Sequence, residues 1–304
     1  MMPARLCSVE YPILRAAVRP PRDGESVEHA PWAAVAPDAE LARLQRDVPA
    51  AKSRLGASAW HRLVDREFPS PKVPSHAVSR AYAKLFEILL TAAIKDVGTS
   101  LHLGEAPGGF VQALHDSGRA RSTWRWRAVS LPDGPAFAIE KLPMDRGEIV
   151  YADLLTDAGE IFAEGAYDLI TCDGAAEMDH DNLEEEHAAL LVAQTRAAVR
   201  ALAPRGALVV KFYGGAHVRT LCWLASLTQC FDQVSVLKPT TSRATNSERY
   251  CVCRGRLDGV EYEPVCIPAE LWVEDVRRSV LDVLSAAQNR ALRHALAAAA
   301  RQTA

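Results

Sequence analysis

Short apolar segments recur along the chain between residues 100 and 255, and longer segments of mixed polarity separate them. The pattern predicts strands at 100–104, 125–131, 148–152, 167–172, 206–213, 232–237 and 249–255, and helices at 109–117, 135–142, 157–163, 182–203 and 215–230. Two of the strands, 167–172 and 206–213, are almost continuously apolar, as expected when helices cover both faces of a sheet. The alternation therefore predicts an α/β fold with a mostly parallel, doubly wound sheet.

A longer helix is predicted before the first strand, over about 76–95, with Ser75 as its N-cap. Its apolar stripe consists of Val78, Ala81, Tyr82, Leu85, Leu89 and Ala92. Lys84 lies roughly 120° from the middle of this stripe, at the flank of the buried face. At the other end, 232–237 and 249–255 are joined by a polar loop without a helix, which predicts an antiparallel pair at the sheet edge.

The two ends of the chain differ in composition from its middle. Residues 1–74 contain ten prolines, so only short helices are expected there, such as 38–47 and 57–66. Residues 268–304 are rich in alanine and predict a helical extension. We therefore expect an N-terminal extension at 1–74, a central domain at 75–262 and a C-terminal helical extension at 263–304.

The composition excludes some classes of protein. The formal net charge of −3 gives no overall attraction to nucleic acid, so any RNA contact needs a local basic surface. Such a surface is suggested near the end of the sheet by Lys238, Arg243, Arg249, Arg254 and Arg256. The seven dispersed cysteines indicate reduced thiols in an intracellular protein, in nucleus or cytoplasm alike. Neither a membrane span nor a secretory signal is expected.

Candidate chemistry lies where the predicted strands end. The first strand leads into Gly-Glu-Ala-Pro-Gly-Gly at 104–109, a turn that presents backbone N–H groups at the start of a helix. Polar residues follow the other strands: Ser130, Asp153, Asp173 and, inside the fifth strand, Lys211. A lysine in a central strand needs a carboxylate neighbour. We expect Asp173, at the end of the adjacent strand, to be that neighbour.

Five segments occur in a characteristic order. They are Ser-Arg-Ala-Tyr-Ala-Lys-Leu at 79–85, Leu-Gly-Glu-Ala-Pro-Gly-Gly-Phe at 103–110, Asp-Gly at 173–174, Val-Lys at 210–211, and a loop at 238–250 that contains Lys-Pro, Ser-Arg and Asn-Ser-Glu-Arg-Tyr. Together they resemble the FtsJ/RrmJ-type RNA 2′-O-ribose methyltransferases over about 79–255. The resemblance implies a Rossmann-like methyltransferase fold, with a mostly parallel seven-stranded sheet and an antiparallel edge strand.

The resemblance also implies roles for individual residues. It implies a catalytic tetrad of Lys84, Asp173, Lys211 and Glu248. It implies that S-adenosyl-L-methionine is the cofactor, held by Gly104, Pro107, Gly108, Gly109, Phe110, Ser130, Asp153 and Asp173, and that no metal is needed. RNA contacts are expected from Arg80, Lys238, Ser242 and Arg243. The family often has acidic residues where this chain has His102 and Ser130, and Glu105 or Asp133 are candidates to replace them.

The substrate implied is RNA. The segment 242–253 and Ser-Leu-Pro-Asp-Gly-Pro at 130–135 are more similar to the mRNA cap-1 branch than to the bacterial ribosomal branch, which favours the first transcribed nucleotide of capped mRNA and a possible capping partner. Ribosomal or transfer RNA is the alternative substrate, and an inactive module that binds RNA or a partner is the alternative of another class. Lys211 could act as a general base or as a cation, and the sequence leaves both roles open.

Overall fold

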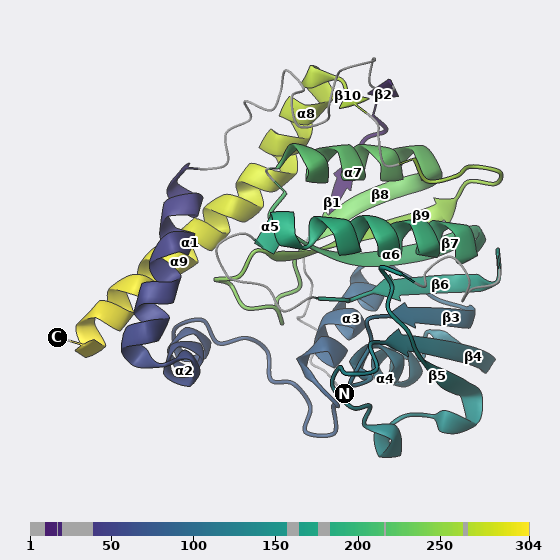
Figure 1. Ribbon diagram of the computed structural model, residues 1–304, viewed down its shortest axis with the longest axis horizontal. Helices are drawn as coiled ribbons and strands as arrows, with labels where there is room; N and C mark the ends of the chain where they lie inside the picture. Colours follow the sequence, from purple (N-terminus) through teal and green to yellow (C-terminus); the bar gives the residue numbers. More distant parts are fainter. Residues whose placement is uncertain are drawn as a thin grey trace.

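The computed structural model describes residues 10–16, 18–19, 39–156, 164–175, 183–215, 217–263 and 267–303. An eight-stranded sheet forms its centre, with the strand order β1-β8-β9-β7-β6-β3-β4-β5 (Figure 1). The strands are β1 (Glu10–Ile13), β3 (Val97–Leu103), β4 (Ala120–Ser130), β5 (Gly147–Tyr151), β6 (Tyr167–Cys172), β7 (Leu202–Tyr213), β8 (Phe231–Leu237) and β9 (Glu248–Arg256). Strands β3 to β7 are mutually parallel, whereas β9 is antiparallel to both of its neighbours. The predicted fold class is confirmed.

The sheet has one more strand than the seven expected. Strand β1 pairs with β8 in antiparallel register from Glu10 against Leu237 to Ile13 against Val234. The Glu10 carboxylate also lies 2.7 Å from Nη2 of Arg254, which anchors the added strand to β9. Consequently β9 lies inside the sheet, between β7 and β8, and the antiparallel edge strand is β1. A four-residue strand in a proline-rich segment is too short for its pattern to stand out.

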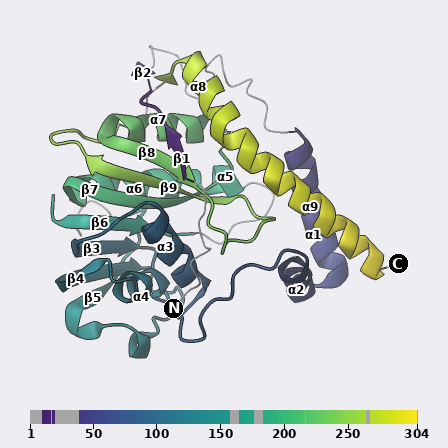
Figure 2. The same cartoon turned by 180° about the vertical axis from the view of Figure 1, so that it is seen from behind.

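Helices cover both faces of the sheet. In Figures 1 and 2, α6 (Ala188–Ala201) and α7 (Val218–Cys230) lie on one face, and α3 (Arg80–Thr91) and α4 (Gly109–Asp116) lie on the other. Each face has its own apolar core, because strand side chains alternate between the two faces. This explains why the central strands are almost continuously apolar in sequence.

Three helix predictions need correction or stay open. Helix α3 begins at Arg80, because the Ser79 hydroxyl, rather than Ser75, accepts the backbone N–H of Ala81 at 3.2 Å. The helix expected at 135–142 is absent from that described segment, which contains only a 3₁₀ turn at Ile139–Lys141; a second such turn, Met144–Arg146, follows. The predicted helix at 157–163 lies outside the described residues. Strand β7 starts earlier than expected, directly after α6.

The two ends of the chain pack against each other. Helix α1 (Ala39–Leu55) continues through Pro49, and with α2 (Ala57–Glu67) it packs beside α9 (Asp282–Thr303) (Figures 1 and 2). Their shared core contains Trp60 and Ala298, and Arg293 forms an ion pair with Glu40 at 2.9 Å. Helix α8 (Glu270–Val276) leads into α9 through Arg277–Leu281, and β2 (Val18–Arg19) pairs with β10 (Ile267–Pro268). The three-part division of the chain stays a prediction.

Candidate active site

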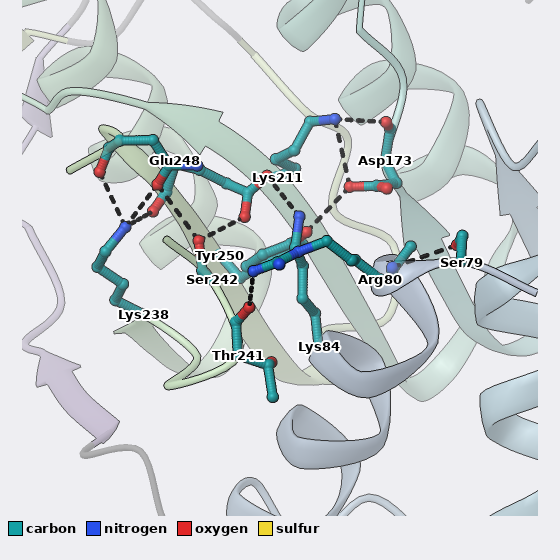
Figure 3. Close-up of polar contacts among 12 residues, drawn as sticks. Ser79, Arg80, Lys84, Asp173, Lys211, Lys238, Thr241, Ser242, Glu248 and Tyr250 are labelled. Carbon is teal, nitrogen blue, oxygen red and sulfur yellow. Dashed lines mark hydrogen bonds and ion pairs between the residues drawn. The ribbon is translucent and has the colours of Figure 1, made fainter. Parts of the chain in front are cut away.

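Two predicted site residues meet at the carboxyl ends of β6 and β7 (Figure 3). Nζ of Lys211 donates to the backbone carbonyl oxygen of Asp173 at 2.6 Å and lies 3.3 Å from its carboxylate oxygen Oδ1. The hydroxyl of Tyr250 donates to the same Oδ1 at 3.0 Å. The expected lysine–carboxylate pair is therefore confirmed, and a tyrosine completes it.

The other two tetrad residues form a second buried pair. Nζ of Lys84 lies 2.8 Å from Oε2 of Glu248, and the two side chains are only 15% and 7% exposed. The hydroxyl of Ser242 donates to the second carboxylate oxygen, Oε1, at 2.7 Å. Both oxygens of Glu248 thus have a fixed partner, which holds the carboxylate in one orientation.

The strand register explains why these side chains lie together. Strands β7 and β9 pair Lys211 with Tyr250 and Tyr213 with Glu248. Residues directly opposite each other on antiparallel strands share one face, and residues two apart on one strand do so as well. All four side chains therefore lie on the face covered by α3, and α3 adds Lys84 from its second turn.

The charges at this site stabilise one another. Burial raises the pKa of Glu248, but Lys84 and Lys211 lower it by more, to about 2. Burial lowers the pKa of Lys211, but the carboxylates of Asp173 and Glu248 raise it by more, so that it lies above its usual range. At neutral pH the site therefore contains a carboxylate and an ammonium group in close proximity.

A Gly-rich turn follows β3 at the same edge of the sheet. Gly104 has φ of +67°, and a Cβ there would lie 2.2 Å from Cα of Gly174. Gly108 has φ of +112° at the N-cap of α4, and a Cβ on Gly109 would lie 2.5 Å from the Ser79 hydroxyl. The backbone approaches that the sequence predicted at this turn are thus present, next to the Asp173–Gly174 segment.

Comparison with known proteins identifies the family to which this site belongs. A family model described as FtsJ-like methyltransferase matches residues 77–256, more than half of the chain. The chain belongs to the FtsJ-like methyltransferase family. The match includes the Gly-rich turn and all four tetrad positions.

The curated relatives share only part of their length with this FtsJ-like chain. A cap-specific mRNA (nucleoside-2′-O-)-methyltransferase 2 of Drosophila melanogaster is 29% identical over 70% of this chain and 36% of its own length. A human tRNA (cytidine(32)/guanosine(34)-2′-O)-methyltransferase is 29% identical over 61% of this chain and 53% of its own. A solved putative ribosomal RNA methyltransferase from Plasmodium falciparum is 20% identical, covers 59% of this chain and 98% of its own, and has a TM-score of 0.46. The chain thus spans about a third to a half of these curated relatives.

The remaining turn residues of this FtsJ-like chain lie around the glycines. The carbonyl oxygen of Pro107 accepts the N–H of Ala138 at 3.0 Å, and Phe110 is fully buried with its ring 6.3 Å from that of Tyr250. Ser130 ends β4 and accepts the N–H of Ala106 at 2.8 Å. Asp153 follows β5 and accepts the N–H of Leu155 at 2.9 Å. All four lie beside the carboxyl ends of neighbouring strands.

Glu105 and His102, two of the residues considered for the usual acidic positions, have buried structural partners. Glu105 is buried and its Oε1 accepts the N–H groups of Phe110 and Val111 at 2.7 and 2.9 Å, which caps α4. Burial raises the pKa of Glu105 to about 8, although the two N–H donors act in the opposite direction. His102 is fully buried between the hydroxyls of Ser100 and Thr171, each 2.8 Å away. Asp133 is exposed.

The four expected RNA-binding residues fall into two groups. Lys238 and Ser242 face the protein: Nζ of Lys238 donates to the carbonyl oxygens of Asn246 and Glu248 and to the Asn246 side chain at 2.8 to 2.9 Å (Figure 3). Burial lowers the pKa of Lys238 to about 7. Arg80 and Arg243 are partly exposed, and both lie beside the Asp65 carboxylate, at 3.7 and 3.1 Å.

Some residues of the site were not predicted, and others lie elsewhere than predicted. Tyr250 ends the Asn-Ser-Glu-Arg-Tyr segment, and its register opposite Lys211 is the signal that reveals its role. Asp65 lies 178 residues from Arg243, and no local pattern links them. Arg249 is not on a basic surface, because it is 2% exposed and donates to Ser285 at 3.1 Å. Arg254 instead pairs with Glu10.

Two further findings concern expectations from composition. The side chains of the cysteines at 172, 222, 230, 251 and 253 are buried. Among the described helices, none combines the length and the apolar character that crossing a membrane requires.

Proposed function

We propose that this chain transfers a methyl group from S-adenosyl-L-methionine to a ribose 2′-hydroxyl of RNA. The observation that carries the proposal is the meeting of Lys84, Asp173, Lys211 and Glu248 on one sheet face, beside a glycine-lined turn. Two ammonium groups and two carboxylates at this spacing suit a polar acceptor that must lose a proton. The residue roles below belong to this proposal.

The residues at the strand ends fit the cofactor. The glycines at 104, 108 and 109 let the turn pack closely against Gly174, Leu142 and Ser79. Ser130, Asp153 and Asp173 lie at the ends of the neighbouring strands β4, β5 and β6. In open α/β sheets, ligands bind in this position beyond the carboxyl ends. When bound there, S-adenosyl-L-methionine supplies a methyl group on a sulfonium centre, a chemistry that needs no metal. Phe110 supports the turn from the core.

Lys211 acts as a cation in the proposed mechanism. Its pKa is raised by Asp173 and Glu248, so at neutral pH its ammonium group has no capacity to accept the hydroxyl proton. It instead lowers the pKa of the acceptor hydroxyl and stabilises the negative charge that develops on the oxygen. The proton passes to solvent. Asp173 fixes Lys211, while Glu248 fixes Lys84 beside the acceptor.

The partly exposed cations provide the RNA contact. Arg80 and Arg243 both lie beside Asp65. Arg80 is four residues before Lys84 in α3, and Arg243 belongs to the loop that leads into β9. Contacts of this kind bind phosphate and give affinity without sequence preference. We assign Lys238 and Ser242 to positioning Glu248, because their polar atoms contact Glu248 or the loop before it.

We propose capped mRNA as the substrate, with the first transcribed nucleotide as the expected acceptor. The name of the Drosophila relative and the segments at 130–135 and 242–253 support this choice. Transfer or ribosomal RNA is the second candidate, because the human relative is named a tRNA 2′-O-methyltransferase. An inactive binding module is disfavoured by the complete tetrad.

One experiment separates these substrates. Short RNAs of one sequence, with and without a cap, are incubated with the chain and methyl-labelled S-adenosyl-L-methionine, and nuclease digestion then locates the modified nucleotide. We expect label on a ribose near the 5′ end of the capped RNA and little on the uncapped RNA. Equal labelling of both RNAs would favour the second candidate. No transfer to capped, transfer or ribosomal RNA would reject the enzymatic proposal.

A further inference from the structure

A cavity of about 330 Å³ lies between the helices of the two chain ends and the loop that leads into β9. Helix α1 contributes Gln45 and Lys52, α2 contributes His61, and α9 contributes Gln288. Arg243 closes the side formed by the loop. Seven of its fourteen lining residues lie outside the 77–256 segment that matches the family, so half of the cavity wall comes from the segments that flank it.

The cavity lies next to the tetrad. Its wall includes Ala175, two residues after Asp173, and Asn246 and Ser247, which directly precede Glu248. Tyr213 also lines it, and Nζ of Lys211 lies 5.8 Å from the centre of the Tyr213 ring. A nucleotide strand whose ribose reaches Lys211 therefore has this cavity beside it.

The cavity is lined by two positive charges that repel each other. Burial lowers the pKa of Lys52, and the charge of Arg243 lowers it further. Asp65 holds Arg243 in place, with oxygens 3.1 and 3.4 Å from Nε and Nη2, but it also lies beside Arg80. One carboxylate thus faces two arginines, and a bound anion between Lys52 and Arg243 would relieve their repulsion.

We propose that this cavity binds a phosphate-bearing nucleotide of the RNA substrate, adjacent to the acceptor nucleotide. Lys52 and Arg243 contact the phosphate, as Lys and Arg do in other nucleic-acid complexes. The amides of Gln45 and Gln288 offer both donors and acceptors to the base or ribose. This inference rests on the proposed function for the identity of the ligand, and it makes the appended helices part of substrate selection.

The test compares two variants of α1, each of which loses one positive charge. Lys52→Gln removes a charge from the cavity wall, whereas Arg54→Gln removes one from the exposed side of α1, outside the cavity. RNA binding is measured by fluorescence anisotropy at several salt concentrations, without turnover. We expect Lys52→Gln to weaken binding about tenfold and to lower the salt slope by about one, and Arg54→Gln to change neither clearly. Equal effects of both variants would overturn the proposal.

A second variant distinguishes a loss of RNA binding from a folding defect. Gln45→Glu introduces a carboxylate into the cavity and is expected to weaken RNA binding while binding of S-adenosylhomocysteine stays unchanged. Unchanged RNA affinity in this variant would also contradict the proposal. RNAs with a 5′-triphosphate, a cap or a 5′-hydroxyl identify the phosphate: loss confined to the first two indicates the 5′ end, and equal loss in all three indicates a backbone phosphodiester. Since no turnover is measured, an absence of methyl transfer would reject the proposed reaction without affecting this result.

Discussion

The Lys211 ammonium group contacts Asp173 twice, through the backbone carbonyl oxygen at 2.6 Å and through carboxylate oxygen Oδ1 at 3.3 Å. The contact to the carbonyl oxygen helps to position Lys211 and does not require the Asp173 side chain. The contact to the carboxylate raises the pKa of Lys211 and so favours its protonated form. Substitutions at the two residues can distinguish them.

Removing the lysine tests whether it is catalytic. Lys211→Ala is expected to lower kcat about 1,000-fold or more. The variant lacks the ammonium group that stabilises the negative charge developing on the acceptor oxygen. Cofactor affinity should stay within about twofold, since the Gly-rich turn is untouched. The matched control is Lys95→Ala, which removes an exposed lysine after α3 and should retain full activity. Substantial turnover by Lys211→Ala would exclude the assigned role.

Neutralising the carboxylate tests the protonation state. Asp173→Asn keeps the carbonyl contact but removes the largest effect that raises the pKa of Lys211. Burial then dominates, so Lys211 loses its proton at lower pH than in the wild type. We expect kcat to fall about 100-fold and its decline at alkaline pH to begin earlier in the variant.

The wild-type pH profile separates the two possible roles of Lys211. A lysine that acts as a cation, with water taking the proton while the methyl group is transferred, keeps kcat flat between about pH 7 and 9, because the pKa of the lysine lies above that range. A general base would give a kcat that rises with pH as the ammonium group loses its proton. A tenfold rise per pH unit across this interval would therefore contradict the cation role.

Ser242 tests whether a residue expected to bind RNA positions a carboxylate instead. Its buried hydroxyl donates to Oε1 of Glu248 at 2.7 Å. Ser242→Ala should lower kcat about tenfold with an unchanged KM for RNA, because one of the partners that orient Glu248 is lost. The exposed Ser53→Ala serves as the control. A raised KM with normal kcat would instead indicate a direct RNA contact.

The sequence was most informative where function requires an unusual residue. A lysine in an apolar central strand predicted its own carboxylate partner, and the Asp173 contact follows from parallel strand ends meeting at one edge of the sheet. The glycines at 104, 108 and 109 predicted the turn. The structure shows why Gly104 is needed there, because its φ is positive and a Cβ has no room. In both cases, local chemistry leaves few alternatives.

Other features depend on distant parts of the chain. Lys238 and Arg243 are both cations in one polar loop, yet Lys238 faces its own backbone and Arg243 faces Asp65. Which of these partners each cation contacts depends on the folded conformation of the loop. Strand β1 likewise depends on a free edge at β8, and the cavity depends on α1 meeting α9. No periodicity within a short segment predicts these contacts.

Two glycines with the same backbone conformation test the close approach at the turn. Gly104 and Gly118 have φ of +67° and +68°, but a Cβ at Gly104 meets the Gly174 backbone at 2.2 Å, whereas one at Gly118 meets nothing within 4 Å. Gly118→Ala should cost about 1 kcal/mol of unfolding free energy, and Gly104→Ala about 3 kcal/mol more. Urea unfolding measures both, and equal costs would show that the turn relaxes freely.

The buried His102 should make the protein sensitive to acid. Burial lowers the pKa of His102 to about 3, and its ring nitrogens lie 2.8 Å from the hydroxyls of Ser100 and Thr171. Below its unfolded pKa of about 6.5, the unfolded chain binds a proton that the folded chain does not bind until about pH 3. The histidine therefore lowers the unfolding free energy by about 1.4 kcal/mol for each pH unit in that interval.

Replacing this histidine should remove its share of the acid sensitivity. His102→Gln keeps a neutral donor and acceptor, so we expect lower stability at neutral pH but a shallower fall on acidification. Burial also lowers the pKa of His187, to about 4, and that residue keeps its contribution in both proteins, so the difference between them isolates His102. His115→Gln, at an exposed position of α4, should retain the wild-type slope. Urea unfolding over the same pH series measures all three proteins, and parallel curves for wild type and His102→Gln would show that His102 accepts a proton in the folded state.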